Sequence, residues 1–313
     1  MKKDALLAVV LGGPSAEREV SLKTGHAICE ALKEKGYNAV ELELVPDRLI
    51  MDLKNMGAQV VFNAVHGLYG EDGRLQAMLE AAGIPYTGCG VLASAVSMDK
   101  VATKRYLQAA GISNPDCLIL HRRSAGNLKE IKQKILDRFG SRCVIKAASQ
   151  GSSIGVFIIK DESEIENALE ECFKLSDHVL IEECITGKEL TVALMEEDGL
   201  PIALPIIWIA PHSGAYDYHS KYTKGATDYH CPAPFEKKIT DYIQDLARDT
   251  YQVLDLSGVA RVDIMYDDVK QIGYVLEANS VPGMTATSLV PKAALAAGIS
   301  FPELCEKILL SAK

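Results

Sequence analysis

Two short stretches in the last part of the chain carry residues that could bind a metal ion and stabilise negative charge. In "LEANSVPGM", Glu277 and Asn279 are two residues apart. "ARVDIMY" gives Arg261 and Asp263 the same spacing. Because alternate residues of a strand point to one face, each pair would share a face if its stretch is a strand. If the two strands pair, all four polar groups converge.

The four side chains suit two tasks. Three of them offer the hard oxygen ligands that Mg²⁺ takes alongside substrate phosphates, namely Asp263, Glu277 and Asn279. Arg261 cannot ligate a metal and would instead stabilise developing negative charge. These residues alone leave open an alternative, a polar sheet face exposed to solvent.

A glycine- and serine-rich stretch, "GSSIGV" at 151–156, lies between two apolar runs. Its composition is that of a hairpin loop whose backbone amides could close over phosphates, although a plain turn has the same composition. Lys146 precedes it in "CVIKAA", where a lysine is costly unless its ammonium meets an anion. Lys100 opens a predicted helix and could also meet phosphate, with a solvated helix face as the alternative.

Two common nucleotide-binding motifs lack their defining residues. Neither glycine-rich loop is GxxxxGK[ST], and "LGGPSAE" is not GxGxxG. The sequence therefore argues against a Walker-type site and against an NAD-binding oxidoreductase.

The first ninety-odd residues alternate between strand and helix patterns. Apolar runs predict strands at 5–13 and 58–67, and an alternating pattern predicts one at 38–45. Helical patterns lie at 21–37 and 73–84. This alternation predicts an α/β lobe with a largely parallel sheet.

The pattern changes after a predicted capped helix at 97–112. Four apolar stretches between 117 and 185, with two helical stretches among them, predict a small α+β lobe. The remainder predicts a mainly antiparallel sheet, a long polar loop at 211–234, and helices at 235–256 and at the carboxyl end. We therefore expect three lobes, at 1–98, 99–186 and 187–313.

Composition narrows the class of protein. The chain has 313 residues, 48% of them hydrophobic, so it should bury a substantial core. Its net charge of −9 argues against a general attraction to nucleic acid or to an anionic membrane. The eight cysteines show no metal spacing and indicate reduced core thiols. Since the amino-terminal apolar run is too short for an export signal, we expect a cytoplasmic protein.

Six segments in order resemble one enzyme family across nearly the whole chain. They are "GGPSAEREVSL" at 12–22, "HGLYGEDGRLQ" at 66–76, "GIPYTGCGVLASAVSMDK" at 83–100, "GSSIGV", "YDYHSKY" at 216–222 and "LEANSVPGMTATSLVP" at 276–291. The chain thus resembles the D-alanine–D-alanine ligase family of ATP-grasp enzymes. The resemblance implies a three-lobed ATP-grasp fold that mixes α/β and α+β lobes, with ATP between the last two.

The family's reaction, part of peptidoglycan synthesis, phosphorylates the carboxylate of one D-alanine with ATP. The amine of a second D-alanine then attacks the acylphosphate. The resemblance implies two Mg²⁺ or Mn²⁺ ions on three ligands, Asp263, Glu277 and Asn279. It implies phosphate clamping by Lys100, Lys146 and Lys221, and an oxyanion site made of Arg261 and the amide of Gly283.

The same resemblance assigns the remaining site residues. Glu17 would pair with the first substrate's ammonium through a network with Ser152 and Tyr222. His66 would lie near the first carboxylate, while Ser288 and the amide of Leu289 would hold the second. The nucleotide would contact Ser153, with Glu182 at the adenine amino group and Glu189 at the ribose. For most of these positions the residues alone also allow a structural role, such as a loop acid, a buried histidine or a helix cap.

Some positions depart from the family pattern, and some alternatives stay open. The departures are His219, Ser220, Glu183 and Cys184, none of which is assigned to chemistry. Another acceptor, such as D-lactate, is the main alternative, but Tyr222 favours an amine by the family resemblance. A nucleotide-binding module without activity is a second alternative, against which Arg261 and the three ligands all remain. The family also implies a homodimer.

Overall fold

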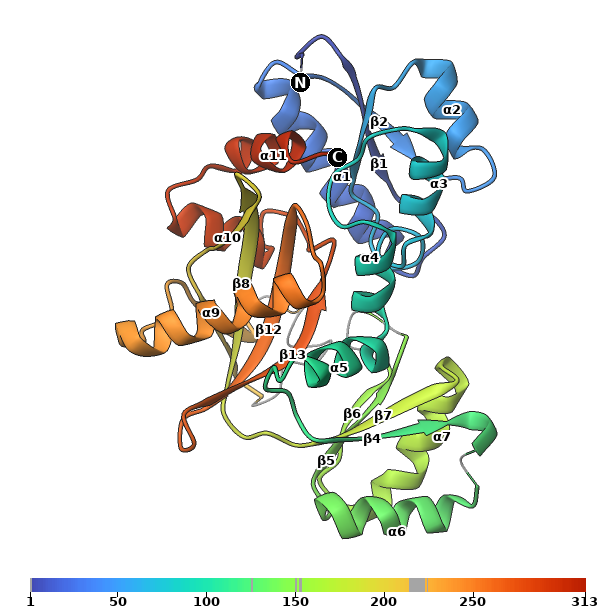
Figure 1. Cartoon of the computed structure of the whole chain (residues 1–313), viewed down its shortest axis with the longest axis vertical. Helices are drawn as coiled ribbons and strands as arrows, with labels where there is room; N and C mark the ends of the chain where they lie inside the picture. Colours follow the sequence, from blue (N-terminus) through green and yellow to red (C-terminus); the bar gives the residue numbers. More distant parts are fainter. Residues whose placement is uncertain (1, 125, 150, 152–153, 214–222, 224) are drawn as a thin grey trace.

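Three sheets follow one another along the chain in the computed structural model, which describes residues 2–124, 126–149, 151, 154–213, 223 and 225–313. Figure 1 shows the first sheet at the top of the elongated molecule and the second, four-stranded sheet at the bottom. The third sheet, last in sequence, lies between them. It therefore borders both other parts.

The first sheet has three parallel strands in the order β2-β1-β3, which confirms the predicted α/β part. Helices cover both of its faces. Leu7 and Val9 of the central strand face a core shared with the first helix, whereas Ala8 and Val10 face the opposite core. Burial on both faces explains why this strand is apolar at every position. The elements are β1 Leu6–Leu11, α1 Arg18–Glu34, β2 Asn38–Glu43, α2 Leu49–Met56, β3 Val60–Asn63, α3 Arg74–Ala82 and α4 Val91–Met98.

The second sheet is antiparallel, in the order β4-β7-β5-β6, as the sequence predicts. Its elements, with the helix that leads into it, are α5 Lys100–Ala109, β4 Cys117–His121, α6 Leu128–Phe139, β5 Cys143–Ala147, β6 Val156–Ile158, α7 Ile165–Leu175 and β7 His178–Glu183, with 3₁₀ turns at Arg122–Ser124 and Glu162–Glu164. Ile145 and Ile181 pack on α6 and α7 in one core. Their neighbours Lys146 and Glu182 alternate to the other face, toward the third sheet.

The third sheet is antiparallel, in the order β11-β10-β8-β12-β13, with β9 paired to β8. Its elements and the last helices are β8 Lys188–Glu197, β9 Leu200–Ala203, β10 Ile207–Pro211, β11 Thr227–His230, α9 Lys237–Val253, β12 Val259–Asp267, β13 Ile272–Asn279, α10 Leu289–Ala296 and α11 Phe301–Leu310. One face packs on α9 through residues such as Val262 and Ile264. On the other face, α10 and α11 share a core with α1.

Several sequence expectations differ from the structure. Helices α2 and α4 were not expected, and the loop predicted at 211–234 contains a strand, β11. Within the predicted antiparallel sheet, the apolar stretch 200–210 forms two strands, β9 and β10, which are separated at Leu204–Ile206 around Pro205. All eight cysteines are free thiols, but three are only half-buried, so the expectation of core thiols is wrong for Cys117, Cys184 and Cys231.

The partition into lobes at 1–98, 99–186 and 187–313 stays a prediction, and helices near its first boundary pack against the third sheet. Ala93 and Val96 of α4, together with Leu107 of α5, pack in the core beneath the third sheet.

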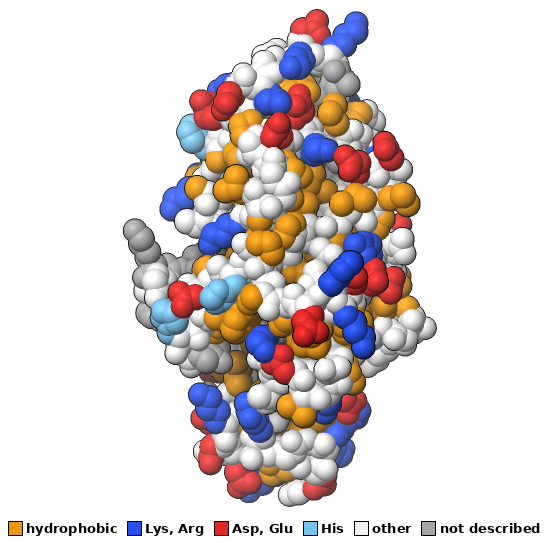
Figure 2. All heavy atoms as spheres, turned by 90° about the vertical axis from the view of Figure 1, so that its left-hand side faces the viewer, with side chains coloured by type: hydrophobic (Ala, Val, Ile, Leu, Met, Phe, Trp, Pro, Cys, Tyr) orange, Lys and Arg blue, Asp and Glu red, His pale blue; other side chains and the backbone are white. Residues whose placement is uncertain are grey.

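On the face drawn in Figure 2, acidic and basic side chains are interspersed. Among the described residues, no helix has the length and apolar character to cross a membrane.

Candidate active site

The two polar pairs singled out in the sequence lie side by side on neighbouring strands. In the β12–β13 pairing, Arg261 is opposite Asn279 and Asp263 is opposite Glu277, which confirms that the strands pair. The register shifts immediately afterwards, where Ile264 pairs with Val275. This bulge turns Val275 into the apolar core while Glu277 stays on the polar face, since an extra residue resets the alternation.

The Asp263 carboxylate accepts four hydrogen bonds from the protein. Arg261 Nε donates to Oδ1 at 2.9 Å and Nη2 to Oδ2 at 2.8 Å. Thr191 Oγ1 donates to Oδ1 at 2.6 Å, and Asn279 Nδ2 to Oδ2 at 3.2 Å. These bonds match the roughly four acceptor positions of a carboxylate. Asp263 would therefore ligate a metal only after one of these donors moved.

Glu277 and Asn279 fit a magnesium site more directly. Both line the pocket described below, and the Glu277 side chain is 40% exposed. Because the Asn279 amide nitrogen points to Asp263, its carbonyl oxygen is the atom available to a ligand. Within the part of the chain that the structure describes, no group of three or more Asp, Glu, His or Cys side chains is arranged to bind a metal ion. Mg²⁺ commonly binds through one or two carboxylates plus substrate phosphates, so the donor set is suitable.

Lys100 lies beside these ligands. It begins α5, whose N-cap Asp99 accepts a hydrogen bond from the Ala102 amide, as the capped-helix prediction requires. Its ammonium is 3.7 Å from Glu277 Oε2, and its backbone N–H donates to Ala148 at the end of β5. Lys100 is therefore placed between the second and third sheets.

Lys146 and Glu182 meet in a buried ion cluster that includes a third residue, Lys104. Lys146 Nζ is 2.5 Å from Glu182 Oε2, and Lys104 pairs with Oε1 of the same carboxylate. Lys104 also donates to the Pro115 carbonyl at 2.9 Å. The anion that the apolar setting of Lys146 requires is thus Glu182 in this structure, and its contact with phosphate stays a prediction.

The charges of this cluster shift one another's ionisation. Burial opposes ionisation of Glu182, but the two ammonium groups outweigh it and hold the pKa of this carboxyl below its ordinary value. Burial lowers the pKa of Lys104, with Glu182 opposing. The cluster carries two cations and one anion. The sequence analysis missed Lys104. Its spacing of three residues from both Val101 and Leu107 places it on the buried face of α5, which could have indicated a buried, paired lysine.

Glu189, the predicted ribose ligand, lies on β8, the strand next to β12. It pairs with Met265 of β12, two residues from Asp263. Burial, with the carboxylates of Asp263 and Glu277, raises the pKa of Glu189 to about 8. The contact of Glu189 with a ribose stays a prediction.

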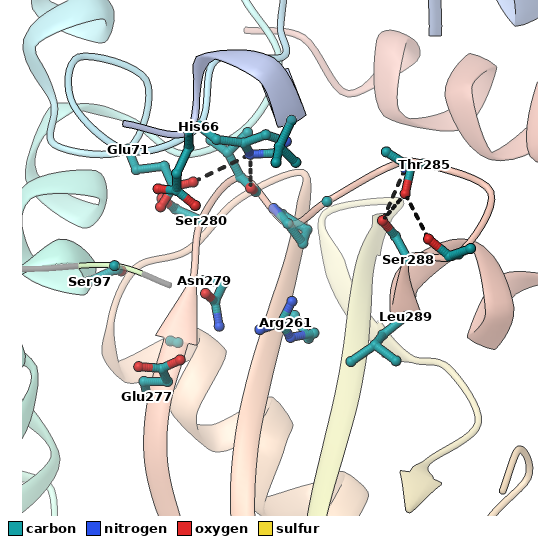
Figure 3. Close-up of a pocket in the computed structure, with 18 of the residues that line it drawn as sticks. His66, Glu71, Ser97, Arg261, Glu277, Asn279, Ser280, Thr285, Ser288 and Leu289 are labelled. Atoms are coloured by element: carbon teal, nitrogen blue, oxygen red, sulfur yellow. Dashed lines mark hydrogen bonds and ion pairs between the residues drawn. The ribbon is translucent and has the colours of Figure 1, made fainter. Parts of the chain in front are cut away.

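A pocket of about 560 Å³ joins most of the predicted site residues. This volume lies in the ordinary range for small-molecule sites. Figure 3 shows Glu277 and Asn279 on one side of Arg261, with Ser288 and Leu289 on the other. The pocket therefore brings groups suited to phosphate and metal close to groups suited to a second ligand.

One end of the pocket is built by the first part of the chain. The Glu17 carboxylate lies close to two glycines, since a Cβ at Gly67 would be 2.7 Å, and one at Gly151 3.4 Å, from its Oε2. Side chains at Gly67 would displace this carboxylate. The predicted partners Ser152 and Tyr222, and likewise Ser153 and Lys221, lie outside the described residues.

His66 is 4% exposed and held on both ring nitrogens. Nδ1 is 3.1 Å from the Val281 carbonyl, and Nε2 is 3.0 Å from Thr24 Oγ1. Glu71, which the sequence analysis missed, is 3.5 Å from Nδ1 and also lines the pocket. The ring thus links the first part of the chain to the loop after β13 and has a structural role besides any contact with substrate.

The other end of the pocket is the turn that leads into α10. Ser288 occupies the N-cap position, but its Oγ accepts from the Thr285 amide at 3.0 Å, before the helix, and makes no side-chain cap bond. A Cβ at Gly283 would lie 2.9 Å from this Oγ. Glycine at this position therefore lets the turn approach Ser288 closely. Tyr229 and Lys292 also line the pocket and were not singled out in the sequence.

The chain matches two protein-family models. The model described as D-ala D-ala ligase N-terminus matches residues 46–89, and the one described as D-ala D-ala ligase C-terminus matches residues 106–310. A D-alanine–D-alanine ligase of Syntrophotalea carbinolica is 46% identical over 308 residues, which cover 98% of this chain and 95% of that protein.

Solved structures of ligases are similar to this chain over nearly its whole length. The crystal structure of a D-alanine–D-alanine ligase from Bacillus anthracis complexed with ATP is similar with a TM-score of 0.82 at 35% identity, covering 98% of this chain and 97% of that one. The VanG D-Ala:D-Ser ligase of Enterococcus faecalis has a TM-score of 0.81 at 28% identity, covering 97% of this chain and 98% of that one.

Proposed function

Because the chain belongs to the D-alanine–D-alanine ligase family and has its ATP-grasp fold, we propose that it joins two D-alanines, using ATP, for peptidoglycan synthesis. The structural observation that carries this proposal is the position of Arg261 in the pocket. It stands between Glu277 and Asn279 on one side and the Ser288 turn on the other. A cation at this point can stabilise charge that develops between two bound substrates.

Arg261 can do this while it holds Asp263. Two of its five N–H donors bind the Asp263 carboxylate, and the other donors lie on edges of the guanidinium that face away from that carboxylate. We propose that these donors, with the Gly283 amide, stabilise the oxyanion of the acyl group. Asp263 then orients the guanidinium, and this role is additional to any contact with metal.

The nucleotide phosphates would lie beside Lys100 and Lys146. Lys100 reaches the same carboxylate, Glu277, that we assign to the metal. Mg²⁺ bound by Glu277 and Asn279, and by Asp263 once a donor moves, would neutralise charge on the phosphates. The proposal includes two ions at this place, with Mn²⁺ able to replace Mg²⁺.

Glu17 is proposed to bind the ammonium of the first D-alanine. Its carboxylate borders the pocket next to Gly151 of the glycine-rich stretch, and His66 lies on the same side. The second D-alanine would bind at Ser288 and the Leu289 amide. This order places the two substrates on either side of Gly283 and Arg261.

A product assay tests the function directly. Purified protein with ATP and Mg²⁺ is given D-alanine alone, then equimolar D-alanine with D-serine or D-lactate, and products are identified by mass. D-alanyl-D-alanine should dominate in every mixture. A mixed product in excess would favour another acceptor, such as the D-serine named for the VanG relative. No product with any acceptor would refute the ligase activity.

Assembly and location follow from family membership as further proposals. We propose a homodimer that acts in the cytoplasm. Analytical ultracentrifugation at micromolar concentration tests the first, with a monomer as the contradicting result. Fractionation of the source cells tests the second.

A further inference from the structure

Lys292 is a cation in the pocket that no part of the proposed mechanism uses. It lies on α10, and its backbone N–H donates to the Ser288 carbonyl, one turn earlier. Residues four apart share a helix face, and a side chain on a helix points back toward the amino-terminal end. The Lys292 side chain is therefore directed toward the same turn as Ser288.

The surroundings of Lys292 hold a cation but do not neutralise it. Its Nζ lies 3.9 Å from the centroid of the Tyr229 ring, so the ammonium makes a cation–π contact with a residue of β11. Among the described residues, no carboxylate is among the groups that shift the pKa of this ammonium. Burial lowers the pKa of Lys292, with Cys231 opposing, as expected for a cation that has lost water without gaining an anion.

The position of Lys292 separates it from the phosphate-binding end. Lys100 lies against Glu277, whereas Ser288 and Leu289 lie on the other side of Arg261 (Figure 3). Under the proposed function, the ligand at the α10 end is the acceptor amino acid, which lies beyond the acyl group. Of the groups on an amino acid acceptor, its carboxylate is the anion that must be held away from Arg261 so that the amine can face the acyl carbon.

We infer that Lys292 binds the α-carboxylate of the acceptor amino acid, together with Ser288 and the Leu289 amide. The inference rests on the proposed function, because it presupposes an acceptor in this pocket. Tyr229 acts as a positioning residue, since its ring fixes the ammonium without competing for it. Lys292 then contributes to the choice of acceptor by favouring molecules with a free carboxylate.

The test replaces the charge and separates the two amino acid sites. Lys292→Met keeps the approximate length but removes the ammonium. The KM of the second D-alanine should rise roughly tenfold to hundredfold, the range for a lost charge-assisted hydrogen bond. The KM values of ATP and of the first D-alanine should stay within about twofold. Lys292→Arg should restore most of the affinity because it keeps a cation.

D-alaninamide, which has no carboxylate, provides a second measurement. Parent and Lys292→Met should use it as acceptor with similar kcat/KM. The matched control is Lys307→Met, the same change at an exposed lysine paired with Glu197 on the surface, which should behave as the parent does. Thermal unfolding of all variants checks that they fold.

Three results would overturn the inference: an unchanged KM for the second D-alanine, equal losses with D-alanine and D-alaninamide, or an equal rise in the KM of ATP. The last two would indicate that Lys292 only holds α10 against β11. If the parent forms no dipeptide, the proposed function has failed and the inference fails with it. If the parent ligates and Lys292→Met matches it, the inference alone has failed.

Discussion

Arg261 and Asp263, two residues apart on β12, are joined by two parallel hydrogen bonds of 2.9 and 2.8 Å. Both side chains are 12% exposed. Glu277, directly opposite Asp263, is instead 40% exposed and faces the pocket. The two carboxylates therefore have different tasks. Asp263 holds the site together, and Glu277 meets ligand.

This difference predicts that two matched substitutions impair different properties, stability in one case and turnover in the other. Asp263→Asn places an amide N–H group against the Arg261 donors and should lower the free energy of unfolding by about 3 kcal/mol, as for other broken buried ion pairs. Glu277→Gln should change it by no more than about 0.5 kcal/mol. However, Glu277→Gln should lower kcat at limiting Mg²⁺ by about tenfold to hundredfold.

Urea unfolding and ligation rates over a Mg²⁺ series measure both effects. Glu197→Gln, at an exposed carboxylate, is the control for the amide change. Near-normal ligation by Glu277→Gln at limiting Mg²⁺ would remove Glu277 from the metal site. Equal destabilisation by both variants would contradict the division of tasks.

Lys146→Ala should weaken ATP binding by about tenfold or more, because one charge-assisted contact with phosphate is lost. The fold should persist, since Glu182 keeps Lys104 as its partner. Calorimetric titration with ATP measures the affinity, and Lys307→Ala is the surface control. An unchanged affinity would show that Lys146 serves only to neutralise Glu182.

The buried cluster predicts that its anion matters more for stability than its second cation. Glu182→Gln leaves Lys104 and Lys146 close together without a carboxylate and should cost about 3–5 kcal/mol. Lys104→Met leaves the Glu182–Lys146 pair intact and should cost clearly less, since burial already disfavours this ammonium. Denaturant unfolding compares the two. A larger loss for Lys104→Met would mean that its bond to Pro115 dominates.

Glu189 predicts a pH dependence of stability in the metal-free protein. Its pKa is about 8 in the folded chain and near the ordinary 4.5 when unfolded. Between these values the folded state binds more protons, so this contribution to stability is full below about pH 4.5 and is lost as pH rises through 8. In EDTA, the free energy of unfolding should therefore fall more between pH 5 and 8 for the parent than for Glu189→Gln. Parallel curves would contradict the raised pKa.

Local patterns were sufficient for much of the fold. Period-two alternation predicted that Glu277 and Asn279 share a face, and the prediction that Lys100 opens a helix is confirmed by α5, whereas Ser97 and Met98, placed in the same helix by the sequence, belong to α4. Two apolar runs and one alternating stretch predicted the three parallel strands of the first sheet. The pattern failed at 211–234, where polar composition concealed β11, because an edge strand need not be apolar.

The sequence by itself determined which residue types were available and, through short-range periodicity, which faces they occupied. Tertiary structure alone decided which of them meet. The bulge at Asp263/Ile264 keeps Glu277 on the polar face, Lys104 and Lys146 meet on Glu182 from separate elements, and Lys292 reaches Tyr229 across the pocket. Strand order, register and helix docking set these contacts. Since they depend on burial summed over residues far apart in the chain, no local pattern carries them.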